Sequence, residues 1–221
     1  MTVVGLKGGV AVRMELYNSS LCFVNSHLAA HVEEVERRNQ DYVDICNRLV
    51  FSAASHASGK SIKDHDVVFW IGDLNYRLSS ELEMSRVKEL LEQQNYAALL
   101  EADQFRAQYA LRKIFVGYEE GVIEFRPSYK YDPGTDNWDT SEKNRAPAWC
   151  DRILWKGENV QALEYRSHPT LRMSDHKPVS ALLECGVKII DPVRYRKIYE
   201  EVMKKLDKLE NEFLPQVIIY L

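Results

Sequence analysis

A run of five apolar residues, Val67 to Ile71, constrains the fold of this chain more than any other feature of its sequence. Polar residues lie on both sides of the run, a pattern typical of a strand that is buried on both faces of a sheet. Such a strand needs a covering layer on each side. Apolar residues at helical spacing, with charged residues between them, occur at 35–49, 84–93 and 96–109. The pattern therefore predicts an α/β protein with several central strands.

Shorter patterns predict the remaining elements. Further strands are predicted from alternating or apolar runs, the first two forming a hairpin through Asn18–Ser20: Val10–Tyr17, Leu21–Val24, Arg152–Trp155 and Val179–Ile190. Turn-forming residues predict surface connections at Ser52–Lys63, which we expect to be flexible, and at Tyr131–Arg145. An amphipathic helix near the end of the sequence is predicted from Tyr195, Ile198, Val202, Leu206 and Leu209.

Composition and charge exclude several classes of protein. With 221 residues, 45% of them hydrophobic, the chain can form one ordinary domain with a packed core. Its formal net charge of −4 argues against a protein that coats nucleic acids, because such proteins are normally basic. The apolar runs are too short to span a bilayer. The four cysteines are scattered, with no C-x-x-C pair, as is typical of reduced thiols.

The segment Trp70–Arg77 carries the strongest candidate site. The apolar strand ends there, Gly72 permits a tight turn, and Asp73 and Asn75 follow two residues apart. Residues two apart in an extended chain point the same way. A carboxylate and an amide would then converge at the carboxyl end of a strand, where α/β proteins usually bind ligands. An Asx turn that simply closes the strand explains the same spacing equally well.

Two further segments place acidic residues beside a histidine or an arginine. Asp175 precedes His176 just before a predicted strand, and an acid beside an imidazole can hold it in one tautomer or charge state. Asp151 and Arg152 interrupt an apolar stretch, and buried charges need partners. Solvated surface residues would explain the first pair without any function, and a structural ion pair would explain the second.

Histidines and lysines complete the set of candidates. His27 and His31 lie four residues apart after another strand, but the glutamate of a zincin motif and a third ligand are missing, so zinc is not expected. Lys7 beside two glycines, and Tyr129 with Lys130, are candidate phosphate contacts. Acids, amide, imidazoles and cations at strand ends together suit a hard cation such as Mg²⁺ with a phosphate ester.

Six motifs occur along the chain in the order seen in inositol polyphosphate 5-phosphatases, which the chain resembles from about residue 5 to residue 215. The motifs are Lys7–Val10, Asn25–His31, Trp70–Arg77, Pro127–Lys130, Pro147–Arg152 and Ser174–Pro178. Residues 37–42 and 209–215 resemble the type II group of that family. The resemblance implies the endonuclease/exonuclease/phosphatase (DNase I-like) fold, an α/β sandwich of two sheets packed face to face with helices outside.

The resemblance also implies an activity, the Mg²⁺-dependent removal of the 5-phosphate from inositol polyphosphates and from phosphoinositides such as phosphatidylinositol 4,5-bisphosphate. By position in the motifs, Asp73 would orient and deprotonate the attacking water, and Asn75 and His27 would bind the scissile phosphate. His176 would face the developing negative charge, with Asp151 as its orienting partner. Such roles agree with phosphoryl transfer, which depends on alignment and charge neutralisation.

The same motifs imply metal and substrate contacts. Asp175 would lie near the Mg²⁺ ion, together with Asp73. Contacts to the rest of the substrate, including a neighbouring 4-phosphate, are implied for Lys7, Asn25, Tyr129, Lys130 and Arg152.

Departures from the family pattern lead to further expectations. The family's catalytic domains extend upstream of the Lys-Gly-Gly motif and carry there the first strands of the sandwich and a glutamate that ligates Mg²⁺. Leu6 stands where the family has asparagine. We therefore expect 1–215 to be a partial catalytic domain without its N-terminal strands, and 216–221 to be the truncated start of a β-rich domain. An apolar sheet edge or face should be left exposed. The isolated chain should be nearly inactive, and turnover within about tenfold of a complete domain, or ~1.4 kcal/mol of barrier, would contradict this expectation.

The resemblance implies phosphoinositide headgroups at membrane surfaces and soluble inositol phosphates as partners, and no nucleic acid. Small GTPases and trafficking adaptors are expected only for a full-length member, and the implied location is cytoplasmic, peripheral to endosomal, Golgi and plasma membranes. One alternative is a non-catalytic fragment that binds headgroups or protein partners. A metal-dependent nuclease is the other, and the net charge disfavours it. Residues 105–115 suit either a membrane contact or a core helix.

Overall fold

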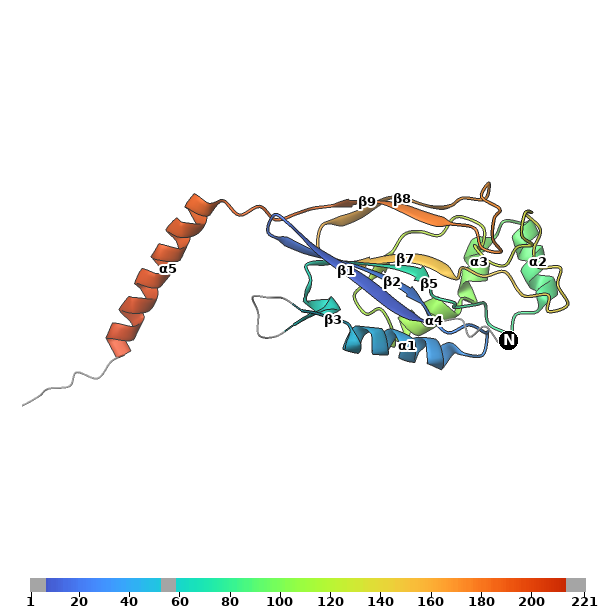
Figure 1. The fold of residues 1–221 in the computed structure, drawn as a ribbon, viewed down its shortest axis with the longest axis horizontal. Helices are drawn as coiled ribbons and strands as arrows, with labels where there is room; N and C mark the ends of the chain where they lie inside the picture. Colours follow the sequence, from blue (N-terminus) through green and yellow to red (C-terminus); the bar gives the residue numbers. More distant parts are fainter. Residues whose placement is uncertain (1–6, 53–58, 214–221) are drawn as a thin grey trace, which may run out of the picture.

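The computed structural model describes residues 7–52 and 59–213 (Figure 1). Its centre is a five-stranded sheet in the order β1-β2-β5-β7-β6, in which β2 and β5 are parallel and the other neighbours antiparallel. These strands are β1 (Gly8–Leu16), β2 (Ser19–His27), β5 (Val67–Asp73), β6 (Glu119–Glu120) and β7 (Asp151–Lys156). Two antiparallel pairs accompany it: β3 (Val50–Phe51) with β4 (Lys60–Ser61), and β8 (Val160–Ser167) with β9 (Val179–Cys185).

Five α-helices and one short 3₁₀ helix, η1, are present in the described residues. They are α1 (Val35–Arg48), η1 (Ile62–Asp64), α2 (Met84–Glu92), α3 (Tyr96–Glu101), α4 (Gln104–Ala110) and α5 (Pro192–Phe213). In Figure 1, α1 lies along one side of the central sheet, β8 and β9 lie along the other, and α5 stands out from the body. No helix within the described residues is both long and apolar enough to cross a membrane.

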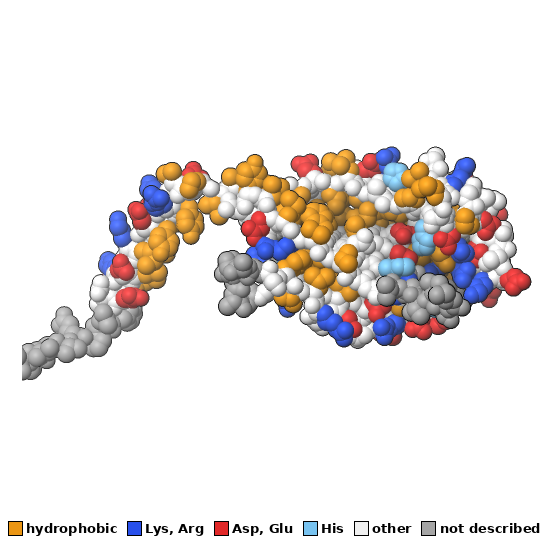
Figure 2. Space-filling model, viewed as in Figure 1, with side chains coloured by type: hydrophobic (Ala, Val, Ile, Leu, Met, Phe, Trp, Pro, Cys, Tyr) orange, Lys and Arg blue, Asp and Glu red, His pale blue; other side chains and the backbone are white. Residues whose placement is uncertain are grey.

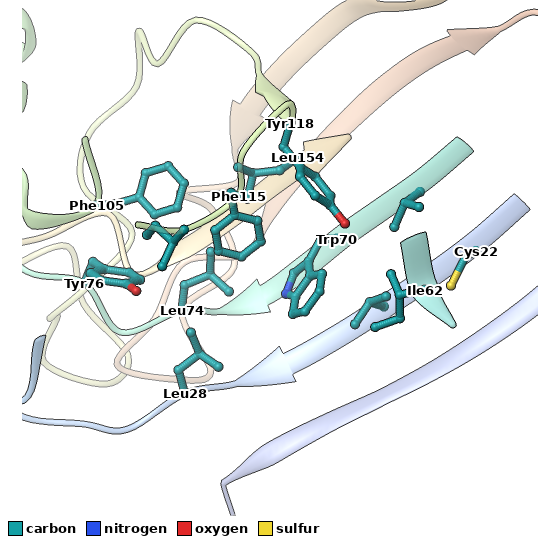
Figure 3. Packing of buried hydrophobic residues seen from close by; sticks show 13 residues of the cluster. Cys22, Leu28, Ile62, Trp70, Leu74, Tyr76, Phe105, Phe115, Tyr118 and Leu154 are labelled. Atoms are coloured by element: carbon teal, nitrogen blue, oxygen red, sulfur yellow. The ribbon is translucent and has the colours of Figure 1, made fainter. Parts of the chain in front are cut away.

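Strand β5 is buried on both faces, as its apolar sequence predicts. On one face Trp70 packs at right angles to Phe115 and Tyr118, with ring centroids 5.1 and 6.3 Å apart (Figure 3). Side chains of α1 pack against the same cluster. On the other face, Phe69 belongs to a second cluster that the β8–β9 pair covers through residues such as Leu183. The predicted two-sheet sandwich with helices outside is therefore confirmed.

The remainder of the second face is open. Val10, Val12, Met14 and Leu16 alternate along β1 and point away from α1, with exposed fractions between 41 and 71%. Phe23 of β2 lies directly opposite Val12 and is 40% exposed. The expected open apolar sheet face is thus present, and it lies on β1 and β2 beside the area that β8 and β9 cover.

Some predicted boundaries were wrong. The single helix predicted over 96–109 is divided into α3 and α4, because the Asp103 side chain caps α4 by accepting from the Arg106 N–H at 2.9 Å. The last predicted strand ends at Cys185 instead of Ile190, and β8 is an additional strand. Phe105 and Phe115 are buried, so residues 105–115 contribute to the core. Tyr131–Arg145 is a connection without regular elements, as predicted.

Several predictions concern parts of the chain that are only partly described. Of the predicted flexible connection, residues 53–58 lie outside the described residues, whereas Lys60–Asp64 forms β4 and the 3₁₀ turn. Leu6, which stands where the family has asparagine, and the domain boundary expected at 215/216 also lie outside the described residues.

Candidate active site

The pairing register of the central sheet assembles the candidate site. Gly8 of β1 lies opposite His27 of β2, His27 opposite Asp73 of β5, and Asp73 opposite Asp151 of β7. Side chains directly opposite one another in a sheet project from the same face. Consequently the ends of β2 and β5 and the start of β7 present an imidazole and two carboxylates side by side, and Lys7 reaches them from the start of β1.

Gly72 makes this strand end possible. Its φ of +138° lies in a region that L side chains rarely adopt, and a Cβ there would come within 2.0 Å of the Ser26 carbonyl oxygen. The close approach of β5 to β2 at this point places Asp73 beside His27.

His27, Asp73 and Lys7 form a linked group. His27 Nε2 lies 3.1 Å from Asp73 Oδ2 and also contacts Lys7 Nζ. Burial, followed by the nearby charge of Asp151, raises the pKa of the Asp73 carboxyl. Burial likewise lowers the pKa values of His27 and Lys7, while Asp73 opposes both shifts. The environment therefore disfavours the charged form of each group and makes the Asp73 carboxylate a better proton acceptor than a free one.

His176 is held by Asp151. Asp151 Oδ2 lies 2.8 Å from His176 Nδ1 and accepts a second hydrogen bond, 2.7 Å long, from the Ser128 hydroxyl. Burial alone would lower the pKa of His176, but the hydrogen bond and charge of Asp151, together with Asp73 and Asp175, raise it. An imidazolium is thus favoured, with the Nδ1–H directed at Asp151.

Asn75 does not converge with Asp73 as the extended-chain argument predicts. The strand ends at Asp73, Asn75 has a φ of +57°, and its N–H donates to Asp73 Oδ1 at 3.0 Å, which is the Asx turn. The Asn75 amide is buried: Nδ2 donates to the Leu28 carbonyl at 3.0 Å, and Oδ1 accepts from Arg77. Asn75 therefore forms the floor of the site, and its amide is not an open phosphate contact in this structure.

Lys130 and Tyr129 border the site beside His176. Lys130 Nζ lies 2.8 Å from Asp175 Oδ2, and this hydrogen bond raises the lysine pKa. The Tyr129 ring packs on the His176 ring with centroids 4.6 Å apart. Asn25 lies two residues before His27 on the same sheet face and is exposed. Except for Asn75, whose amide turns inward, these predicted residues border one region.

Arg152 is the clear correction to the predicted substrate contacts. Successive residues in a strand point to opposite faces, so Arg152 points into the helix-covered core while Asp151 points toward the site. Its side chain is fully buried, with Nη2 2.6 Å from Asp103 Oδ2 and Nη1 3.0 Å from Glu120 Oε2. Arg152 is a structural residue that joins β7 to α4 and β6, and it is not available to a substrate.

Sequence reasoning missed a basic cavity next to this group. The cavity has a volume of about 400 Å³ and is lined by Arg77, Tyr129, Lys143 and Arg145 among others. The Arg77 guanidinium lies over the Tyr129 ring, 4.1 Å from its centroid, so the cavity and the His176 side share a wall. Lys143 and Arg145 lie in a segment that the sequence marks only as a polar connection, and no spacing signal distinguishes them from solvated surface residues.

A divalent cation has a limited donor set here. Within residues 7–52 and 59–213, no three His, Cys, Asp or Glu side chains gather closely enough to hold a metal ion. Asp73 and Asp175 nevertheless both lie close enough to His176 to raise its pKa, although Asp175 is already paired with Lys130. Mg²⁺ is commonly bound by one or two carboxylates, with waters and substrate phosphates completing its shell. The residues present therefore fit a hard cation that binds together with a phosphate ligand.

Comparison with known proteins identifies the family. Residues 1–182 match the model of endonuclease/exonuclease/phosphatase family 2. The chain belongs to this family. It is 54% identical over 216 residues to the type II inositol 1,4,5-trisphosphate 5-phosphatase of Mus musculus. It is also 41% identical over 210 residues to the phosphatidylinositol 4,5-bisphosphate 5-phosphatase INP51 of Saccharomyces cerevisiae. These matches cover 97 and 93% of this chain but 22% of each relative, so the chain spans about a fifth of their length.

Solved structures agree with the fold. The inositol polyphosphate 5-phosphatase domain of spSynaptojanin, in complex with inositol (1,4)-bisphosphate and a calcium ion, superposes with a TM-score of 0.84 at 38% identity. That match covers 96% of this chain and 60% of the synaptojanin chain. A Cimex nitrophorin, solved as a ferrous NO complex, has a TM-score of 0.62 at 31% identity over 80% of this chain. The resemblance to inositol polyphosphate 5-phosphatases is thereby confirmed, and a similar fold also occurs in a nitrophorin that forms a ferrous NO complex.

Proposed function

We propose that this chain carries the phosphomonoesterase site that removes the 5-phosphate from phosphatidylinositol 4,5-bisphosphate and related inositol polyphosphates, with Mg²⁺ as the cation. The observation that carries the proposal is the strand register. It brings His27, Asp73 and Asp151 together at one end of the sheet, beside His176. The 5-phosphatase relatives and the inositol bisphosphate complex of the structural neighbour support the choice of substrate class.

The geometry suits hydrolysis by an activated water. Asp73, whose pKa burial raises, is the proton acceptor that orients the water, and His27 fixes one of its oxygens. His176, whose pKa is raised by Asp151, stabilises in its cationic form the negative charge that develops on the phosphoryl oxygens. Lys7 and Lys130 add positive charge around the phosphate. A bound Mg²⁺ ion would supply further charge neutralisation of the phosphate oxygens, with Asp73 and Asp175 as its protein ligands.

The basic cavity accounts for selection of a substrate with more than one phosphate. Tyr129 separates the cavity from His176, so a ring that presents one phosphate to His176 can place another beside Lys143 and Arg145. Multiple cations in one cavity favour a polyphosphorylated ligand over a simple monoester. Membrane-bound phosphoinositides at endosomal, Golgi or plasma membranes, on the cytoplasmic side, are the proposed setting for such a site.

The test is phosphate release from inositol 1,4,5-trisphosphate and from phosphatidylinositol 4,5-bisphosphate in vesicles, with and without Mg²⁺. Asp73→Asn should lower the rate at least about a hundredfold, because it removes the proton acceptor. Asp44→Asn, an exposed acid on α1, is the matched control and should leave the rate unchanged. Release that is independent of Mg²⁺ or unaffected by Asp73→Asn would contradict the proposed mechanism.

A non-catalytic headgroup-binding role is the second candidate. The observation in its favour is that the described residues gather no three-ligand metal group and that Asp175 is already paired with Lys130. This role predicts Mg²⁺-independent binding of inositol bisphosphate without phosphate release. Arg145→Met should weaken such binding, and calorimetry with and without EDTA distinguishes the two functions.

A further inference from the structure

Helix α5 presents a regular apolar stripe to solvent. Its N-terminus is well defined: Asp191 Oδ1 accepts from the N–H groups of Val193 and Arg194, and Pro192 occupies the first turn. The helix has 22 residues, which corresponds to a length of about 33 Å. In Figure 1 it stands out from the body, and Figure 2 shows orange apolar side chains along it.

The stripe has the spacing of a coiled coil. Its members follow one another at alternating steps of four and three residues and are between 46 and 59% exposed: Tyr195, Tyr199, Val202, Leu206 and Leu209. Alternating steps of three and four are the a and d positions of a heptad, which form the seam between two supercoiled helices. Ile198 and Met203, 50 and 38% exposed, are also apolar and flank this seam at a g and an e position.

The residues outside the apolar stripe occupy the remaining heptad positions, and most of them are charged or polar. Outside the seam and its flanks, every position but Val193 is charged or polar: Arg194, Lys197, Glu200, Glu201, Lys204, Asp207, Lys208 and Asn211. On the flanks, Lys205 occupies a g position and Glu210 the e position of the next heptad. In a parallel pair of helices, the g residue of one lies beside the following e residue of the other. Lys205 and Glu210 of two copies would therefore attract each other twice per dimer.

We propose that α5 is a self-association element, which pairs in parallel with α5 of a second copy of this chain as a two-stranded coiled coil. A second copy fits better than a lipid surface, because helices that lie on membranes carry mainly Lys and Arg on their polar face. From Pro192 to Phe213 the helix has six basic and five acidic residues. The five residues of the stripe amount to two and a half heptads, which is a short seam, so the association is weak and depends on protein concentration.

The segment before α5 is hydrogen-bonded to the body of the protein, so pairing of α5 would also bring the bodies of two copies together. The Asn18 N–H donates to the Lys188 carbonyl at 3.0 Å, and Asn18 Oδ1 accepts from the Ile190 N–H at 2.9 Å. Lys188 Nζ also lies 2.6 Å from Asp66 Oδ1. The segment before α5 is therefore attached to the β1–β2 turn, and paired helices would hold two domains at a defined separation.

Sedimentation of the full chain at concentrations from about 1 to 300 µM, around the affinity expected for a short seam, tests the proposal. The wild type should shift from monomer to dimer, and Leu206→Glu should weaken the dimer at least about tenfold. Leu163→Glu, an equally exposed leucine on β8, is the matched control and should have no effect. A wild type that stays monomeric throughout would overturn the proposal, as would a dimer lost on Val12→Lys but kept in Leu206→Glu.

Charge reversal tests the parallel orientation. Lys205→Glu and Glu210→Lys should each weaken the homodimer, because like charges then face each other. An equimolar mixture of the two variants should form heterodimers, since both pairs become attractive again, and the double variant should return to wild-type association. Vesicle binding that Leu206→Glu abolishes, with no dimer at any concentration, would identify a membrane helix and overturn the proposal. Because the readout is mass, failure of the proposed phosphatase function would leave these results unaffected.

Discussion

The two faces of the central sheet use the same kinds of residue in different ways. On the helix-covered face, Trp70 is fully buried and the charge of Arg152 is closed off by two acids. On the opposite face, Phe23 is 40% exposed, and Asp73 and Asp151 lie side by side at one end of the sheet. Burial and the nearby charge of Asp151 raise the pKa of Asp73. Neighbouring residues of a strand alternate between faces. Arg152 of β7 therefore forms ion pairs inside the protein, whereas Asp151, one residue earlier, faces the candidate site.

The two faces of the small central sheet serve stability and chemistry separately. The helix-covered face contains the largest cluster of buried side chains (Figure 3), and this rigid layer fixes the strand ends. Burial contributes less stability on the open face, and the strand ends on that face stay accessible to a ligand. A site of this kind needs the first face to be firm, because a carboxylate and an imidazole must be held in register to cooperate.

The largest difference between the faces should appear on truncating one aromatic residue on each. Trp70→Ala removes a fully buried side chain and its hydrogen bond to Ser26, so it should lower the free energy of unfolding by about 4 kcal/mol. Phe23→Ala removes a half-exposed ring that stacks on Phe69 and should cost about 1 kcal/mol. Urea unfolding monitored by circular dichroism measures both. Equal losses would show that the open face is covered in solution.

The next effect concerns buried charge. Arg152→Met leaves Asp103 and Glu120 without their counter-charge inside the protein and should cost about 3 kcal/mol of unfolding free energy. Arg37→Met, which breaks only an exposed pair on α1, should cost less than about 0.5 kcal/mol. The same urea titrations apply. A loss of inositol phosphate binding by Arg152→Met without loss of stability would instead return Arg152 to the substrate contacts.

The pattern of apolar residues was sufficient to predict the central strand and the helices that cover it. Apolar runs and helical spacing predicted β5, α1, α2 and the α/β class correctly, because burial dominates the choice between strand and helix. The two-sheet sandwich was implied only by the resemblance to inositol polyphosphate 5-phosphatases. The strand register also brings together His27 and Asp73, two of the candidate site residues, whose roles stay predictions. The burial of Arg152 could not be predicted, because it depends on an ion pair with Asp103 across 49 positions of the chain. The break at Asp103 has a local signal, an aspartate that caps α4, which the helical spacing concealed.

Turn geometry and long-range pairing account for the other errors. The left-handed φ of Asn75 turns its amide inward, and the sequence spacing alone is compatible with either orientation. Strand β8 has alternating residues that are mostly half-exposed, so it lacks the apolar signal of β5. Lys143 and Arg145 acquire significance only because the chain folds back beside Tyr129. Each case depends on a partner far along the chain.

A smaller effect is expected when polarity is added to the open face. Val12→Lys should change the free energy of unfolding by less than about 0.5 kcal/mol, because this side chain is already 67% exposed. It should reduce binding of the dye ANS and slow aggregation on heating, since it interrupts the apolar patch of β1 and β2. Val68→Lys, on the covered face of β5, is the contrasting variant and should unfold the protein.

A partly exposed ion pair ties the two sheets together. Asp66 accepts from the Ser20 N–H and hydroxyl at the start of β2, and it pairs with Lys188, which follows β9. The Lys188 side chain and the Ser20 hydrogen bonds hold the pKa of the Asp66 carboxyl below its usual range. A carboxyl with a lowered folded-state pKa stabilises the fold above its unfolded value of about 3.9 and loses that contribution as the pH falls. Asp66→Asn should therefore reduce stability by under about 1 kcal/mol at pH 7, since the pair is partly exposed, and the difference from wild type should shrink below about pH 4.

Lys188→Met separates the two parts of this contribution. It removes the cation but keeps the Ser20 hydrogen bonds, so its cost at pH 7 should be smaller than that of Asp66→Asn and should fall with added salt. Urea titrations between pH 3 and pH 7 measure both variants. A difference between wild type and Asp66→Asn that does not change with pH would mean that packing, and not the ionised carboxylate, joins the β8–β9 pair to the open face of the sheet.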